Sequence, residues 1–143
     1  MKDIEIAKSL LKEEDLAIAI VKDGKVLFSS REKGIKPMYM AVSELKENLE
    51  GSSVADKVIG KAAAKLCIYG KVKELNTYLI SERAIEVLKE EDIIFTFEKS
   101  TPYIKNRDKT DMCPVEKLSQ NIDDTDELLK RISLFLDSIK EGA

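Results

Sequence analysis

The chain has 143 residues, no histidine and a formal net charge of −3, and 36% of its residues are charged, mostly lysine and glutamate. This length favours a single domain over residues 1–143 with one ordinary core. The absence of histidine excludes catalysis and metal binding that depend on imidazole. Because positive and negative residues are interleaved, there is no strong signal for nucleic-acid binding, and the composition leans toward that of thermophile proteins.

The expected compartment is the cytoplasm. No apolar run reaches the length of a transmembrane helix, and the polar start Met1-Lys2-Asp3 is unlike a secretory signal. Two cysteines, Cys67 and Cys113, cannot form a disulfide framework, which is typical of a reducing environment. We therefore expect a soluble protein without membrane contact.

The first part of the chain is predicted to form a helix, a β-hairpin and a second helix, over residues 3–13, 15–22 with 25–29, and 38–48. Asp23-Gly24 separates the two strands and is a strong signal for a type I′ turn, which requires positive φ at both residues. Pro37 precedes the second helix at a position that suits proline.

Residues 53–69 are predicted as the central helix, which ends at Gly70. Ser53 is the expected N-cap, with Asp56 as its capping-box partner three residues later. Gly60 leaves room for another part of the chain to approach closely. A row of lysines follows the flank opposite the apolar stripe: Lys57, Lys61 and Lys65.

Strand and helix patterns alternate through the rest of the chain: a strand at 74–80, a helix at 82–91, a strand at 92–98, a polar loop at 100–112, a short helix opening at 113–116, and a last helix capped by Asp124 or Thr125. This order predicts a three-layer α/β/α sandwich on a mixed sheet of about four or five strands. The later strands should be parallel, because helical crossovers connect them. Cys67, Tyr78, Phe95 and Phe97 are expected in the core.

Three segments carry a resemblance to a known fold: Ala-Ile-Ala-Ile-Val-Lys-Asp-Gly-Lys at 17–25, Ala-Asp-Lys-Val-Ile-Gly-Lys-Ala-Ala-Ala at 55–64, and Asp-Met-Cys-Pro-Val-Glu at 111–116. With the order of elements, they resemble the cytidine-deaminase-like fold. More closely, the chain is similar to a small family of uncharacterised prokaryotic proteins that share this fold without its zinc site.

The departures from working deaminases concern the zinc ligands. Those enzymes place His-x-Glu or Cys-x-Glu early in the helix after the hairpin, where the match here is Asp56-Lys57-Val58 or a neighbour within a turn. They open the next helix with Pro-Cys-x-x-Cys, where this chain has Ser81-Glu82-Arg83-Ala84. The resemblance therefore implies neither a metal nor a cofactor, and no zinc-dependent deamination.

Eight polar residues are candidates for a ligand-binding site: Asp56, Lys57, Lys61, Ser81, Arg83, Asp111, Cys113 and Glu116. Open α/β sheets bind ligands beyond the carboxyl ends of their parallel strands, where these residues are expected to meet. An anion would suit the lysines near a helix N-terminus.

Each candidate also has a purely structural interpretation. Asp56 and Ser81 are ordinary helix caps in that interpretation, and the lysines and Arg83 form a solvated surface. Cys113 is either a reactive thiol at a helix N-terminus or a small cap residue with Glu116 as its reciprocal partner.

Three functions of different classes remain open. The first is a protein that binds a small anionic or nucleotide-like ligand, with Lys57, Lys61 and Arg83 converging on one pocket. The second is a non-zinc enzyme that uses Cys113, or Asp56 with Lys57. The third is a structural or interaction module that acts as a homodimer, with a filled crevice and an apolar patch elsewhere.

Overall fold

A computed structural model describes residues 1–106 and 108–142, with side chains described to residue 139. The described elements are, in chain order, α1 (Asp3–Glu13), β1 (Ile18–Lys22), β2 (Lys25–Ser30), α2 (Lys36–Leu49), β3 (Ser53–Ile59), α3 (Lys61–Tyr69), β4 (Glu74–Ser81), α4 (Glu82–Lys89), β5 (Ile94–Thr101), α5 (Pro114–Ser119) and α6 (Thr125–Gly142).

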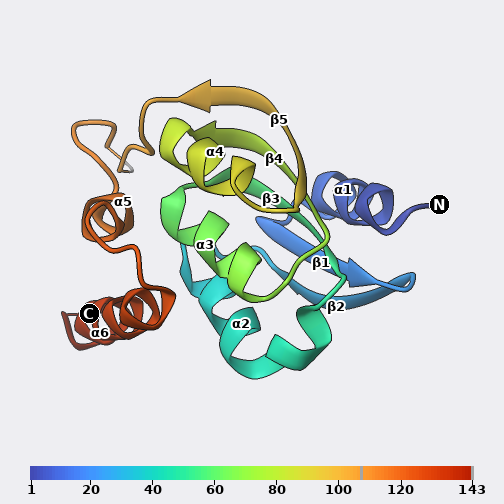
Figure 1. Cartoon of the computed structure of the whole chain (residues 1–143), viewed down its shortest axis with the longest axis horizontal. Helices are drawn as coiled ribbons and strands as arrows, with labels where there is room; N and C mark the ends of the chain where they lie inside the picture. The colour runs from blue at the N-terminus through green and yellow to red at the C-terminus, as the bar shows by residue number, and fades with distance from the viewer. Residues whose placement is uncertain (107, 143) are drawn as a thin grey trace.

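The five strands form one mixed sheet in the order β2-β1-β3-β4-β5 (Figure 1). β1 is antiparallel to both β2 and β3, whereas β3, β4 and β5 run parallel. The predicted α/β class, mixed sheet and parallel later strands are therefore confirmed. The parallel strands are linked by α3 and α4, as crossover connections require.

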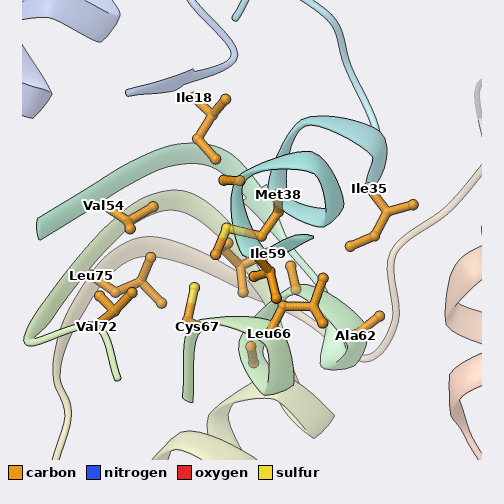
Figure 2. Packing of buried hydrophobic residues seen from close by; sticks show 14 of the residues in the cluster. Ile18, Ile35, Met38, Val54, Ile59, Ala62, Leu66, Cys67, Val72 and Leu75 are labelled. Atoms are coloured by element: carbon orange, nitrogen blue, oxygen red, sulfur yellow. The ribbon is translucent and has the colours of Figure 1, made fainter. Parts of the chain in front are cut away.

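Helices lie on both faces of this sheet. Ile18 and Ile20 of β1 belong to the larger core, which α2, α3 and α6 help to build, whereas Ala19 and Val21 pack against α1. Figure 2 shows side chains of the larger core converging from β1, α2, β3, α3 and β4, including the buried thiol of Cys67. The predicted core position of Cys67 is confirmed.

The hairpin turn is formed as predicted, and α1 anchors it. Asp23 and Gly24 have φ angles of 52° and 78°. Lys22 and Lys25 close the two-residue loop as the last pair of the ladder. The Asp3 carboxylate accepts hydrogen bonds from the backbone N–H groups of both turn residues, each at 2.9 Å.

The prediction of one central helix over 53–69 is wrong. Residues 53–59 form strand β3, Gly60 is extended with φ −98° and ψ −176°, and α3 begins only at Lys61. β3 is paired on both edges, and its first three residues are all buried, so this part of the strand lacks the alternation of a half-exposed strand. The predicted Ser53–Asp56 capping box therefore does not form.

The predicted N-caps of α4 and α6 are confirmed, and that of α5 is not. Ser81 caps α4 by accepting a hydrogen bond from the Ala84 N–H at 3.1 Å, and Asp124 similarly accepts from the Glu127 N–H at 3.3 Å. Cys113 occupies the N-cap position of α5, but its side chain makes no capping bond. Glu116, its expected reciprocal partner, directs its carboxylate to other residues.

The expectation that Tyr78 and Phe97 are core residues is also wrong. They are 48% and 41% exposed, whereas Phe95 is partly buried against the larger core. β5 is an edge strand and has no fully buried residue. The sheet is therefore open on this side, because its helices cover mainly the other strands.

Candidate functional site

The N-terminus of α3 is filled by a carboxylate from α5. Glu116 is only 5% exposed, and its two oxygens accept hydrogen bonds from the backbone N–H groups of Lys61 at 2.9 Å and Ile104 at 2.8 Å. A Cβ atom on Gly60 would lie 2.6 Å from Glu116 Oε1. Since an anion at a helix N-terminus is favoured by the unpaired amides, Glu116 takes the place that an external anion would occupy.

Two lysines of α3 bind the turn between α5 and α6 in return. The Lys61 ammonium group is buried and donates to the carbonyl of Gln120 at 3.1 Å. The Lys65 ammonium group donates to the carbonyl of Asp123 at 2.6 Å, and the Asp123 carboxylate lies 3.5 Å from Lys61 Nζ. Figure 1 shows α5 and α6 beside α3. Lys61 and Lys65 of the predicted lysine row therefore bind this chain's own backbone rather than line an open pocket.

The polar loop after β5 is folded on itself. Asn106 Oδ1 accepts hydrogen bonds from the N–H groups of Thr110 at 3.1 Å and Asp111 at 3.4 Å. The Asp111 carboxylate pairs with Lys117 and accepts from the Met112 N–H, and these contacts hold the pKa of Asp111 below its usual range. Asp111 is thus engaged locally in this loop.

Cys113 follows the loop and is half-buried. Its N–H donates to the Ile104 carbonyl at 2.8 Å, so the same short segment holds both Cys113 and Glu116. These contacts bring residues 111–116 to the start of α3. They were predicted to bind a ligand there, whereas Glu116 binds backbone N–H groups of the chain itself.

Asp56 lies on β3 opposite Ile18 of β1 and Thr77 of β4, and faces the larger core. Burial raises the pKa of its carboxyl group to about 7, although the N–H groups of Val58 and Lys57 act in the opposite direction. Among the described residues, no lysine or arginine pairs with Asp56. A carboxyl group that is removed from water and has no cation beside it costs stability when it ionises.

Lys57 is the next residue of β3 and lies on the opposite face of the sheet, toward α1. Its ammonium group is 3.0 Å from Asp15 Oδ1, and this contact holds the pKa of Asp15 below its usual value. Side chains of neighbouring strand residues point to opposite faces, so Asp56 and Lys57 do not form a common catalytic pair.

An open groove lies between α1 and the uncovered part of β4 and β5, with a volume of about 230 Å³. Its lining combines three lysines with polar, aromatic and apolar side chains: Lys8, Leu11, Lys12, Lys57, Asn76, Thr77, Tyr78 and Glu98. Of the predicted site residues, only Lys57 borders this groove. Most of the lining was missed, because the contact of α1 with β4 is not encoded locally.

The expected convergence of Lys57, Lys61 and Arg83 does not occur. Lys61 is buried beside α5, and Arg83 is exposed on α4. Ser81 is a buried cap of the same helix. The crevice at the ends of the parallel strands is therefore closed by α5, whereas the groove between α1 and the sheet lies on the other face.

These features define an α/β protein with a mixed five-stranded sheet whose crevice is occupied by its own C-terminal segment. The chain belongs to the DUF1893 family: the family model TM1506, described as a domain of unknown function, matches residues 6–136. A crystal structure of a DUF1893 family protein (TM1506) from Thermotoga maritima is 30% identical to this chain. That match covers 92% of this chain and 89% of the other, with a TM-score of 0.84. The comparison with curated proteins gave no match.

Two features of the described residues bear on membrane insertion and on metal binding. No helix among them has both the length and the apolar character needed to cross a membrane. No group of three or more cysteine, aspartate or glutamate side chains in this part of the chain is arranged to hold a metal ion.

Proposed function

We propose that the protein binds a small anionic or nucleotide-like ligand in the groove between α1 and the open part of the sheet. The observation that carries this proposal is the meeting of Lys8, Lys12 and Lys57 around one groove. Lys8 and Lys12 lie one helical turn apart on α1, so both can address the same ligand. Within the described residues, neither of them forms an ion pair.

The charge balance of the groove favours an anion. Three lysines and one glutamate, Glu98, line the groove, and the exposed Asp15 neutralises part of the charge of Lys57. A ligand phosphate or carboxylate can replace Asp15, because that pair is solvent-exposed and contributes little by itself. Lys57 would then change partners without a movement of β3.

The size and the walls of the groove limit the class of ligand. About 230 Å³ is smaller than the roughly 300–1,000 Å³ of pockets that enclose drug-sized ligands, so a bound molecule would remain partly exposed. The ring of Tyr78 is exposed and has the Lys99 ammonium group 5.6 Å from its centroid, so an aromatic ring and a further cation lie beside the groove. Asn76 donates one amide hydrogen to Thr96 Oγ1 at 2.8 Å, which leaves its carbonyl oxygen available to a ligand.

The resemblance to the cytidine-deaminase-like fold supports binding without zinc chemistry. In the observed order of elements, the helix after the hairpin is α2 and the next is α3, so the two zinc motifs would fall at the starts of these helices. The first turn of α2, residues 36–39, has no cysteine or carboxylate, and α3 opens with Lys61-Ala62-Ala63-Ala64. Asp56 lies within β3 and Ser81 caps α4, so neither residue stands at the start of α2 or α3.

A structural or interaction module is the second candidate, and two observations favour it. Glu116 fills the crevice, and aromatic side chains are exposed on β4 and β5. The enzyme hypothesis has less support, because Asp56 and Lys57 lie on opposite faces of the sheet.

The test is a thermal-shift and calorimetric titration with inorganic phosphate, pyrophosphate, adenosine and AMP. Wild type is compared with Lys57→Ala and with Lys8→Ala/Lys12→Ala, and Lys89→Ala on the exposed side of α4 is the matched control. A ligand at one hundred times its Kd should stabilise the wild type by about 2.7 kcal/mol. Binding should weaken in the groove variants and persist in the control.

The proposal fails if none of the phosphorylated probes stabilises the wild type. It also fails if the groove variants bind as well as the control does. Either result would favour the interaction module.

A further inference from the structure

The free edge of β5 is the least protected part of the sheet. β5 keeps a single register with β4 from Ile94 to Thr101, and Figure 1 shows it at the margin of the molecule. β2, at the opposite edge, is shorter, and its pairing shifts register between Ile20 and Val21. Bulges of this kind protect an edge against pairing, and β5 has none in its described pairing.

The backbone of β5 presents alternate residues outward. The Ile94 N–H donates to the Lys73 carbonyl on the β4 side at 3.2 Å. Because successive residues of a strand direct their N–H and C=O groups to opposite edges, those of Phe95, Phe97 and Lys99 point away from β4. A further strand can satisfy these groups.

The side chains at this edge include exposed apolar groups. Ile94 is 55% and Phe97 41% exposed, and the rings of Phe95 and Phe97 stack with centroids 6.3 Å apart. The aromatic pair lies on the face toward the larger core, where Phe95 packs. A partner strand with an aromatic residue opposite Phe97 would extend this stack.

The residues of β5 are compatible with pairing to a second copy of the same strand. In a symmetric antiparallel pair, a two-fold axis runs perpendicular to the sheet and keeps each side chain on the same face. One residue of β5 must therefore lie directly opposite its own copy, and the pair is centred on that residue. Centring on Glu98 would oppose two carboxylates, and centring on Lys99 would oppose two ammonium groups. Centring on Thr96 or on Phe97 places no like charges opposite one another, and centring on Phe97 also opposes the exposed Phe97 ring to its own copy.

We propose that two copies of the chain associate through antiparallel pairing of their β5 strands, centred on Phe97, to form one continuous ten-stranded sheet. In this register Lys99 lies opposite the partner's Phe95, and the Lys99 ammonium group lies over the ring of Tyr78 in its own chain, 5.6 Å from the ring centroid. Thr96 lies opposite the partner's Glu98. Glu98 belongs both to this edge and to the lining of the groove, so the dimer interface borders the proposed ligand site.

The first experiment measures the mass of the full chain by sedimentation across a concentration series, with and without AMP. Wild type should show twice the chain mass, and Phe97→Lys should show the single-chain mass because it opposes two ammonium groups. Val26→Lys changes an exposed residue of the β2 edge and is the matched control, which should remain dimeric. Circular dichroism confirms that both variants are folded.

The second experiment tests the register and does not depend on the folding of Phe97→Lys. In a Cys113→Ser background, Phe97→Cys should form an intermolecular disulfide on mild oxidation, because directly opposed strand residues have the required Cα separation. Thr101→Cys lies away from the axis and should not. A monomeric wild type, or a dimer that survives Phe97→Lys and does not cross-link through Phe97→Cys, overturns the proposal.

Discussion

The carboxylate of Glu116 accepts a hydrogen bond from the backbone N–H of Lys61, and 55 residues separate the two in the sequence. The contact joins α5 to the start of α3, while the Lys61 side chain binds the carbonyl of Gln120 beyond α5. The negative charge of Glu116 therefore lies at the N-terminus of α3, and the positive charge of Lys61 lies at the C-terminus of α5, as the helix dipoles favour. The reciprocal contacts explain why the start of α3 is closed.

Replacing Glu116 tests the importance of this contact. Glu116→Gln should lower the free energy of unfolding by about 2–3 kcal/mol, because it removes a charged acceptor from two buried N–H groups. Glu91→Gln changes an exposed glutamate and should have little effect. Urea unfolding followed by circular dichroism measures both, and equal stability of the two variants would contradict the role given to Glu116.

Gly60 is expected to be required by the same carboxylate. Gly60→Ala should cost about 1–3 kcal/mol, because the added Cβ would meet Glu116 Oε1 at 2.6 Å and one of the two must move. The cost should shrink in a Glu116→Ala background, where the clash is absent. A double-mutant cycle measures this coupling, and strictly additive effects would show that Gly60 matters for another reason.

Asp56 should make stability depend on pH. Desolvation raises the pKa of its carboxyl group to about 7, from an ordinary value of 3.8. The folded protein therefore holds a proton that the unfolded chain loses, and the stability linked to it is complete below pH 3.8 and is lost as pH rises to about 7. Each unit of difference between the folded and unfolded pKa is worth about 1.36 kcal/mol, so the free energy of unfolding should fall by at most on the order of 4 kcal/mol.

Asp56→Asn provides the measurement of this effect. The variant should be more stable than wild type at pH 8, and the advantage should disappear as the pH falls toward 4. Asp92→Asn, at an exposed position, controls for the general effect of removing a charge. Melting curves across this pH range would refute the prediction if wild type and Asp56→Asn changed in parallel.

The hairpin turn should depend on glycine at position 24. Gly24→Val should destabilise the fold by roughly 1 kcal/mol or more, because a β-branched residue resists a φ of 78°. Lys25→Val, at the next and extended residue, is the matched control and should be tolerated. An unchanged melting temperature for Gly24→Val would mean that the turn adopts another conformation.

The sequence by itself determined the features that depend on local physics. Asp23-Gly24 encoded its turn through the φ angles that glycine permits, and Ser81 encoded a helix cap through one short hydrogen bond. The alternation of strands and helices identified the α/β class and the parallel strands, because a helical crossover returns the chain in the same direction.

Tertiary structure alone decided where the central strand ends and what closes the crevice. The apolar residues of 53–69 fit the spacing of one helix, but β1 and β4 offer hydrogen bonds on both edges of residues 53–59, and this pairing overrides the local pattern. Lys61 and Glu116 meet, and Lys8 comes near Lys57, only because helices far apart in sequence pack on the same sheet. Such long-range contacts have no local signal, since either residue alone is equally suited to solvent.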